Sequence, residues 1–517
     1  MAWPERLHGR SWAAVAAVVL SAATLLPLAA GNAQGTSISD EESGTLLAAV
    51  EGSSQDAARK AIERIVEAGD RRFAAVFIEL IRASQIGIAA PSVAIHASEA
   101  LERLSGESFG MNWGAWVRWY AGTELAPPPG FVSFKGRLLG RIDPAFEALL
   151  RDEHPSRIRV EEIVWGGVPY EGIPALDRPP AIPASKATYL EPDEPVFGIR
   201  LGGEARAYPL RILDWHEMAN DELGGVPFSL AYCTLCGSGI AYDTRVPDIG
   251  PLDFGSSGFL MRSNKLMVDR QTRTLWNQFT GRPVLGPLAD KDIRLAVLPS
   301  VVTRWQDWLA RHPDTTVLSL DTGHERPYHP GAAYAGYFAS PDTMFPVRRT
   351  RSELPEKARI FGLERDGLAR AYPLETLLAH RVVNDRFLDE TIVVVVGGPR
   401  LIVNGHSVRS GSARYDAGAE VRAYRRGSHE FRAGEAPHRL TDEAGGHWRV
   451  EEEALVGPDG QRLARVPGVL AYWFGWQSYH PRTELYGSET APRRSGEGEN
   501  RAKEDRAKKR RDEGRGS

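Results

Sequence analysis

The sequence feature that most limits the fold is a repeat within the chain. Residues 197–221 match residues 361–385 at a constant offset of 164, and 13 of the 25 aligned positions are identical. Each copy contains Ala-Arg-Ala-Tyr-Pro-Leu, followed at equal spacing by a leucine, a histidine and an Asn-Asp pair. Because chance does not produce such a match, we predict two related structural units.

The local pattern of each copy predicts a strand, a tight turn, a second strand and a short helix. Gly202-Gly203 and Asp366-Gly367 separate the apolar runs, and these residues tolerate the positive φ that a hairpin turn demands. A proline then stands where the helix would begin, at a position that needs no backbone donor. Another strand follows each helix, so both units are expected to be mainly β.

The N-terminal part of the chain has a different periodicity. Over residues 41–122 the apolar residues recur at spacings of three and four, which is typical of helices. Helices this short must stack on each other to bury their apolar faces, as in a small array of HEAT-type repeats. We therefore predict an α+β protein with a HEAT-like helical-repeat domain followed by a duplicated, mainly β region with short helices. Such arrays commonly dock a protein partner.

The predicted organisation has six segments. They are a signal peptide (1–33), the helical-repeat domain (41–122), a linker and connecting segment (123–157), module one with the C-x-x-C pair (158–322), module two without cysteine (323–487) and a disordered charged tail (488–517).

The N-terminus predicts export. Arg6 and Arg10 precede an apolar or small run over residues 12–30, a pattern typical of a secretory signal cleaved after Ala33. The alternative is an uncleaved membrane anchor, because about 19 apolar residues nearly span a bilayer. Both interpretations place the bulk of the chain outside the cytoplasm, periplasmic or secreted, in an oxidising compartment.

Charge and cysteine content exclude two classes of protein. Lys plus Arg number 63 against 67 for Asp plus Glu, so the basic stripe of a nucleic-acid-binding protein is not expected. The two cysteines, Cys233 and Cys236, cannot form a multi-disulfide scaffold and leave a single C-x-x-C to explain.

The segment Cys233-Thr234-Leu235-Cys236-Gly237 is expected to form a turn between two strands. Two thiolates that converge in a Gly-bounded turn have the geometry of a metal knuckle. A complete site needs two further ligands, and soft thiolates with imidazole suit zinc or copper. The candidate ligands are acidic side chains and His216, His312, His324 and His329.

Two alternatives need only the cysteines. Adjacent thiols in an exported protein oxidise readily, so Cys233 and Cys236 are candidate catalytic residues of a redox pair. A purely structural disulfide, closing a very small loop, is the other alternative. Module two has Gly397 and Arg400 at the equivalent positions but keeps a histidine equivalent to His216. The simpler role of that histidine is therefore to hydrogen-bond the helix to the sheet.

Several ordered motifs resemble the bacterial and archaeal Domain of Unknown Function family 3179. They are Gly166-Gly167, Gly172-Ile173-Pro174-Ala175-Leu176, Ala205-Arg206-Ala207-Tyr208-Pro209, Trp215-His216-Glu217, Asn220-Asp221, Tyr232-Cys233-Thr234-Leu235-Cys236-Gly237-Ser238-Gly239 and Asp269-Arg270. The resemblance implies an exported protein with the Tyr-Cys-x-x-Cys-Gly segment as its site. It implies no reaction. Thr234 departs from the family pattern, in which proline is typical at this position.

Two classes of function remain. The first is an exported metal-binding or thiol-redox protein that uses Cys233 and Cys236, as an accessory or maturation factor for another protein. The second is a non-catalytic scaffold in which the helical repeats and Trp-rich modules bind a protein or a glycan.

Overall fold

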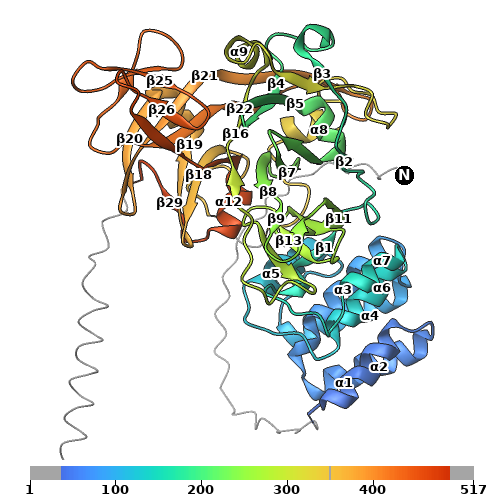
Figure 1. The fold of residues 1–517 in the computed structure, drawn as a ribbon. Helices are drawn as coiled ribbons and strands as arrows, with labels where there is room; N and C mark the ends of the chain where they lie inside the picture. Colours follow the sequence, from blue (N-terminus) through green and yellow to red (C-terminus); the bar gives the residue numbers. More distant parts are fainter. Residues whose placement is uncertain (1–36, 348–350, 489–517) are drawn as a thin grey trace, which may run out of the picture.

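The computed structural model describes residues 37–347 and 351–488. The predicted signal peptide and all of the predicted tail except Ser488 lie outside these ranges. The N-terminal helices gather at one end of the molecule, and the strands form the remainder together with a few short helices (Figure 1). The chain therefore has N-terminal helices followed by a mainly β region. Within the described ranges, no helix has both the length and the apolar character needed to cross a bilayer.

Sequence-local signals define the N-terminal helices. The side chains of Ser39 and Ser54 accept hydrogen bonds from the first turns of α1 and α2, and Gly69 and Gly106 end α2 and α4 in the left-handed conformation. The apolar faces meet in one core, which includes the fully buried Trp116. The helices are α1 (Asp40–Glu51), α2 (Gln55–Ala68), α3 (Ala74–Gln85), α4 (Pro91–Ser105), α5 (Trp113–Ala121), α6 (Phe131–Gly140) and α7 (Pro144–Leu149).

The segment 123–157, expected to be a linker, instead contains α6 and α7. Prolines 127–129 do interrupt the helices, as expected. Beyond them, Phe131, Phe134 and Leu138 carry apolar side chains at helical spacing and pack into the same core as α1 to α5. The segment is therefore part of the helical end of the molecule.

Module one contains three five-stranded sheets. The first has the order β15 (Val297–Leu298), β8 (Ser238–Asp243), β7 (Val226–Cys233), β6 (Met218–Leu223), β2 (Leu176–Asp177). The second has the order β16 (Ser300–Arg304), β4 (Pro195–Leu201), β5 (Glu204–Pro209), β17 (Thr316–Leu318), β3 (Ala181–Pro183). The third has the order β1 (Ile163–Trp165), β11 (Phe254–Met261), β12 (Asn264–Asp269), β13 (Leu275–Asn277), β14 (Arg282–Leu285). A small ribbon pairs β9 (Arg245–Val246) with β10 (Gly250–Pro251), and the helices are α8 (Leu210–His216) and α9 (Trp305–Arg311).

Module two contains two sheets. The smaller has the order β28 (Val469–Tyr472), β18 (Arg359–Arg365), β19 (Leu368–Pro373), β29 (Glu484–Leu485). The larger has the order β20 (Val382–Phe387), β21 (Glu390–Ser407), β22 (Gly411–Arg425), β27 (Arg462–Val466), β26 (Ala454–Val456), β25 (His447–Val450), β24 (Arg439–Thr441), β23 (Arg432–Ala433). Its helices are α10 (Ala335–Ala339), α11 (Leu374–His380) and α12 (Trp473–Tyr479).

The two matching sequence segments have the same order of elements and the same contacts. The order is β4-β5-α8-β6-β7 in one and β18-β19-α11-β20-β21 in the other. In each, the arginine and tyrosine of Ala-Arg-Ala-Tyr-Pro-Leu donate hydrogen bonds to the aspartate of Asn-Asp, at 2.6 Å in the first and 2.7 Å in the second. These residues are Arg206, Tyr208 and Asp221, and Arg370, Tyr372 and Asp385.

Candidate functional site

The C-x-x-C segment lies at the tip of the hairpin formed by β7 and β8. β7 ends at Cys233, β8 begins at Ser238, and these two residues are paired in register. The N–H of Gly237 donates to the carbonyl of Thr234 at 3.2 Å, and Gly237 has a φ of +55°. The predicted turn between strands is therefore confirmed. We call residues 233–238 the cysteine hairpin.

The two cysteines are buried and are not joined to each other. Cys233 is 1% exposed and Cys236 is fully buried, and no disulfide joins them. Cys236 Sγ lies 3.3 Å from the carbonyl oxygen of Ser263, and the Asn264 amide donates to Cys236 Sγ at 3.5 Å. The sulfur atoms thus lie in a dry interior where hydrogen bonds, rather than water, set their chemistry.

The hairpin makes the two thiols unequal. Burial alone would raise the pKa of Cys233, but the hydrogen bond from Cys236 and the backbone N–H of Lys265 lower that pKa below its usual value. Burial, followed by the neighbouring Cys233, raises the pKa of Cys236 well above its usual value. Cys233 is therefore the sulfur that ionises first, and Cys236 is the proton donor beside it.

A buried ion pair lies beside the hairpin. Glu217 ends α8 with a φ of +57°, and its carboxylate forms an ion pair with Lys265 at 3.1 Å. The hydroxyl of Thr234 donates to the same carboxylate at 2.9 Å. Thr234 thus adds a side-chain hydrogen bond inside the turn.

An amide network supports the other side of the hairpin. Asn264 Nδ2 donates to Gln278 Oε1 at 2.8 Å, and Gln278 Nε2 donates to the carbonyl of Ala231 at 3.0 Å. The Ser238 hydroxyl donates to Gln278 Oε1 at 3.2 Å. Asn264, Gln278 and Lys265 were not predicted as site residues. Their only signal in the sequence is that each is a polar residue within or beside an apolar strand.

Module two covers the tip of the cysteine hairpin. The N–H of Tyr472 donates to the Cys236 carbonyl at 2.8 Å, and Arg359 donates to the Gly237 carbonyl at 2.9 Å. Gly475 in α12 lies so close that a Cβ atom there would be 3.1 Å from Cys236 Sγ. The site is therefore completed by a helix and a strand that lie more than 230 residues further along the chain.

The candidate histidine ligands are engaged elsewhere. His216 Nδ1 is 2.8 Å from the carbonyl of Pro174, and Nε2 is 2.5 Å from the hydroxyl of Tyr328. Burial lowers the pKa of His216 to about 4, so its ring is neutral at neutral pH. Both ring nitrogens thus bond loop residues and not the sheet, contrary to the expected role, and the equivalent His380 of module two is exposed.

The other candidate histidines also contact residues other than the cysteines. His324 stacks near His216 with ring centroids 5.2 Å apart, His329 lies near His406, and His312 packs on Trp308. Among residues 37–347 and 351–488, no group of three or more His, Cys, Asp or Glu side chains is placed to hold a metal ion.

Comparison with known proteins identifies the family and nothing finer. No curated protein and no solved structure gives a significant match to the chain. The model of one family, described as "Protein of unknown function (DUF3179)", matches residues 170–483, which is more than half of the chain and includes the cysteine hairpin and most of both modules. The chain therefore belongs to the DUF3179 family.

Proposed function

We propose that the cysteine hairpin is a redox-active dithiol of an exported protein, which serves the maturation of another exported protein. The observation that carries this proposal is the placement of two buried thiols three residues apart in one hairpin turn, where the pKa of Cys233 is lowered and that of Cys236 is raised. This asymmetry is what dithiol–disulfide exchange uses. The extracytoplasmic location rests on the N-terminal sequence pattern.

The reaction balances with a disulfide as co-reactant. The thiolate of Cys233 attacks one sulfur of the disulfide R–S–S–R, and the first R–S⁻ leaves and takes up a proton. Cys236, once deprotonated, attacks the mixed disulfide, so that the second R–S⁻ leaves. The cysteine pair loses two electrons and two protons, and the co-reactant gains them as two R–SH.

Burial sets the condition for this exchange. Both sulfur atoms are buried, and α12 and β28 lie against Cys236, so a bulky disulfide reaches Cys233 only when the surrounding residues move. Tyr337 adds to the cover, because its hydroxyl donates to the carbonyl of Leu235 at 2.6 Å. Exchange with a protein partner is therefore expected to be slower than with a small disulfide.

Thiol titration of the full chain tests the proposal. The protein is incubated with oxidised or reduced glutathione, denatured, and its free thiols are counted with a chromogenic disulfide. We expect two thiols after reduction and none after oxidation, with an oxidised protein that is lighter by two hydrogen atoms. The variants Cys233→Ser and Cys236→Ser serve as matched controls, because each keeps one thiol and cannot close the intramolecular disulfide.

Two outcomes contradict the redox function. A pair that stays reduced in oxidised glutathione, or a disulfide that reduced glutathione leaves intact, removes the exchange reaction. Zinc or copper bound in one equivalent to the wild type, and absent from the double variant, would instead assign the cysteine hairpin to metal binding. Metal content is measured on the same preparations.

We also infer that the modules arose by duplication of one unit. The sequence match, the common order of elements and the repeated Arg-Tyr-Asp contacts support this inference. Further support comes from the packing of Trp308 on Gly198 and of Trp476 on Gly362, where an added Cβ would be 2.3 Å and 2.5 Å from the ring. Module one then carries the cysteines, and module two supplies their cover.

The helical end suits the docking of a protein partner. Its stacked short helices agree with a HEAT-like array, and Ile95 and Met111 expose 50% and 38% of their surface there. Exposed apolar side chains on such an array are typical contact points for another protein. If the redox reaction fails its test, the same surface supports the alternative of a non-catalytic scaffold.

A further inference from the structure

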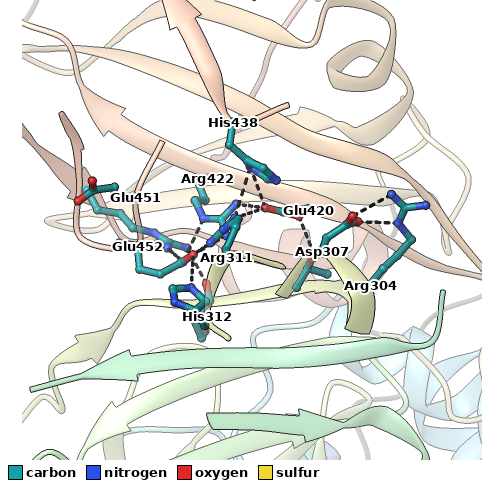
Figure 2. A network of polar contacts seen from close by, with 12 residues as sticks. Arg304, Asp307, Arg311, His312, Glu420, Arg422, His438, Glu451 and Glu452 are labelled. Atoms are coloured by element: carbon teal, nitrogen blue, oxygen red, sulfur yellow. Dashed lines mark hydrogen bonds and ion pairs between the residues drawn. The ribbon is translucent and has the colours of Figure 1, made fainter. Parts of the chain in front are cut away.

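Module two has a buried charge network at the place that corresponds to the cysteine hairpin. Gly397 aligns with Cys233, and a Cβ atom at Gly397 would lie 2.6 Å from both Glu420 Oε1 and His438 Cε1. Where module one has sulfur atoms, module two therefore has a carboxylate and an imidazole. Figure 2 shows these residues beside Arg311 and His312. Arg311 is the last residue of α9 in module one, and His312 follows it.

Two carboxylates and three guanidiniums form the centre of this network. Arg311 forms an ion pair with Glu420 at 2.7 Å and another with Glu452, while Arg422 contacts the same two carboxylates. Arg465 adds an ion pair with Glu452 at 3.1 Å. Four of these five side chains are at most 6% exposed, and Arg311 is 17% exposed.

The network contains one more positive charge than negative charge. Burial opposes ionisation of Glu420, but Arg422, His438 and Arg311 lower its pKa to about 2, so it is anionic. Burial lowers the pKa of His438 to about 4 and that of His312 to about 3, so both imidazoles are neutral at neutral pH. Three buried guanidiniums thus face two carboxylates, and an unpaired buried charge is costly.

A cavity of about 890 Å³ opens onto this network. Arg311, His312, His438 and Glu452 line its inner end. At its outer end lie Arg439 of β24 and Arg449 of β25, which are directly opposite each other in the ladder.

A negative charge would also stabilise the two arginines at the outer end of the cavity. Like charges directly opposite on paired strands destabilise a sheet. Arg449 has a partner in Glu451 at 3.0 Å, whereas Arg439 forms no ion pair with another residue of the described ranges. Glu204 and Asp314 also line the cavity; like Arg439 and Arg449 they are exposed to water, which screens the charge of all four side chains.

We propose that this cavity binds a small molecule bearing an oxyanion, a carboxylate or a phosphate group, at a site separate from the cysteine hairpin. The oxyanion accepts hydrogen bonds from Arg439 and Arg449 and supplies the negative charge that the inner network lacks. Planar guanidiniums bind both kinds of oxyanion in a bidentate manner, so the shared chemistry is the anionic oxygen pair.

Calorimetric titration of the full chain tests the site, with sodium phosphate and sodium succinate as probes at constant ionic strength. We expect saturable binding of at least one probe, and the comparison between probes tells phosphate from carboxylate recognition. Arg439→Gln/Arg449→Gln is expected to weaken that binding about tenfold or more. The control Arg282→Gln removes an arginine that is 38% exposed and does not line the cavity, and should leave affinity unchanged.

A second variant tests the inner end. Arg311→Gln removes the extra positive charge and is expected to abolish binding of the probe, provided that circular dichroism shows a folded protein. If that variant does not fold, the outer pair decides the question alone. Absence of saturable binding by both probes, or equal affinity of the wild type and the Arg439→Gln/Arg449→Gln variant, overturns the proposal.

Discussion

Asp214 shows how burial changes the chemistry of a single residue in this molecule. It lies in α8 and is 4% exposed. Burial raises the pKa of Asp214 to about 8. The hydrogen bond from Tyr232 lowers this pKa, and the nearby charge of Glu217 raises it further. Asp214 is therefore protonated in the folded protein at neutral pH.

A pH dependence of stability follows at this residue. The folded pKa is above the unfolded value of 3.8, so the stabilising effect is complete below pH 4 and is lost as the pH rises to about 8. Asp214→Asn should remove that part of the pH dependence, on the order of a few kcal/mol. Urea unfolding at several pH values measures it. The exposed Asp290→Asn should keep the wild-type slope; an unchanged slope in Asp214→Asn would contradict the prediction.

At the scale of elements, the important feature is that α12 and the cysteine hairpin are packed without space between them. α12 contributes Gly475 at the contact point, because any side chain there would meet Cys236. The backbone bond from Tyr472 to the Cys236 carbonyl holds the start of the same helix against the turn. Any motion that exposes Cys236 must therefore move α12 away from the hairpin.

Substitution of Gly475 tests this packing. Gly475→Ala places a methyl group 3.1 Å from Cys236 Sγ and 3.2 Å from its Cβ, and overpacking of this kind costs about 1–3 kcal/mol. The free energy of unfolding in urea should fall by that amount, and Cys233 should react faster with a small disulfide. The matched control is Gly44→Ala in α1, which meets nothing within 4 Å and should gain about 0.5–1 kcal/mol. Equal stability of the two variants would show that α12 is not tightly packed on the hairpin.

At the scale of the whole molecule, one buried lysine joins the helical end to the β region. Lys135 in α6 is fully buried, and its ammonium group forms an ion pair with Glu79 of α3 at 2.7 Å. The same group donates to the carbonyls of Val160 at 3.2 Å and Ile163 at 2.5 Å, at the start of module one. The two regions are thus connected through polar contacts in a dry interface.

Removal of this lysine should be costly. Lys135→Met leaves Glu79 buried without a partner and is expected to destabilise the protein by about 3–5 kcal/mol. The double variant Lys135→Met/Glu79→Leu should recover most of that loss, because an apolar pair needs no compensation. Urea unfolding followed by tryptophan fluorescence measures both. Arg59→Met, which breaks exposed pairs with Asp56 and Glu63, should cost about 1 kcal/mol or less. A similar loss in Lys135→Met and Arg59→Met would contradict the prediction.

Much of the secondary structure around the site was predictable, because its signals are local. Gly202-Gly203 and Asp366-Gly367 do form the hairpin turns, and Gly237 does bend the turn between β7 and β8. The helices α6 and α7 were not predicted, because the prolines at 127–129 indicated a linker and the prediction was extended to the residues that follow them. Consecutive prolines restrict only the backbone at and next to them, so they do not predict the structure of the residues that follow.

The polar surroundings of the cysteines were not predictable from one sequence. Lys265, Asn264 and Gln278 lie about 30 to 45 positions beyond Cys233, and Gly475 lies far beyond them. The same holds for His216, whose partner Tyr328 is 112 positions away. Such contacts depend on how sheets and helices pack, and no local propensity encodes that packing.

The sequence by itself determined the repeat, the strand–turn–strand–helix units and the position of the only two cysteines on a turn, because these depend on neighbouring residues and on backbone conformation. Only the tertiary structure decided what surrounds them: a buried thiol pair under α12 in module one, and a charge network beside a cavity in module two. The physical reason is that burial and the proximity of charges set the pKa values and reactivity of side chains, and both arise when segments distant in sequence pack together.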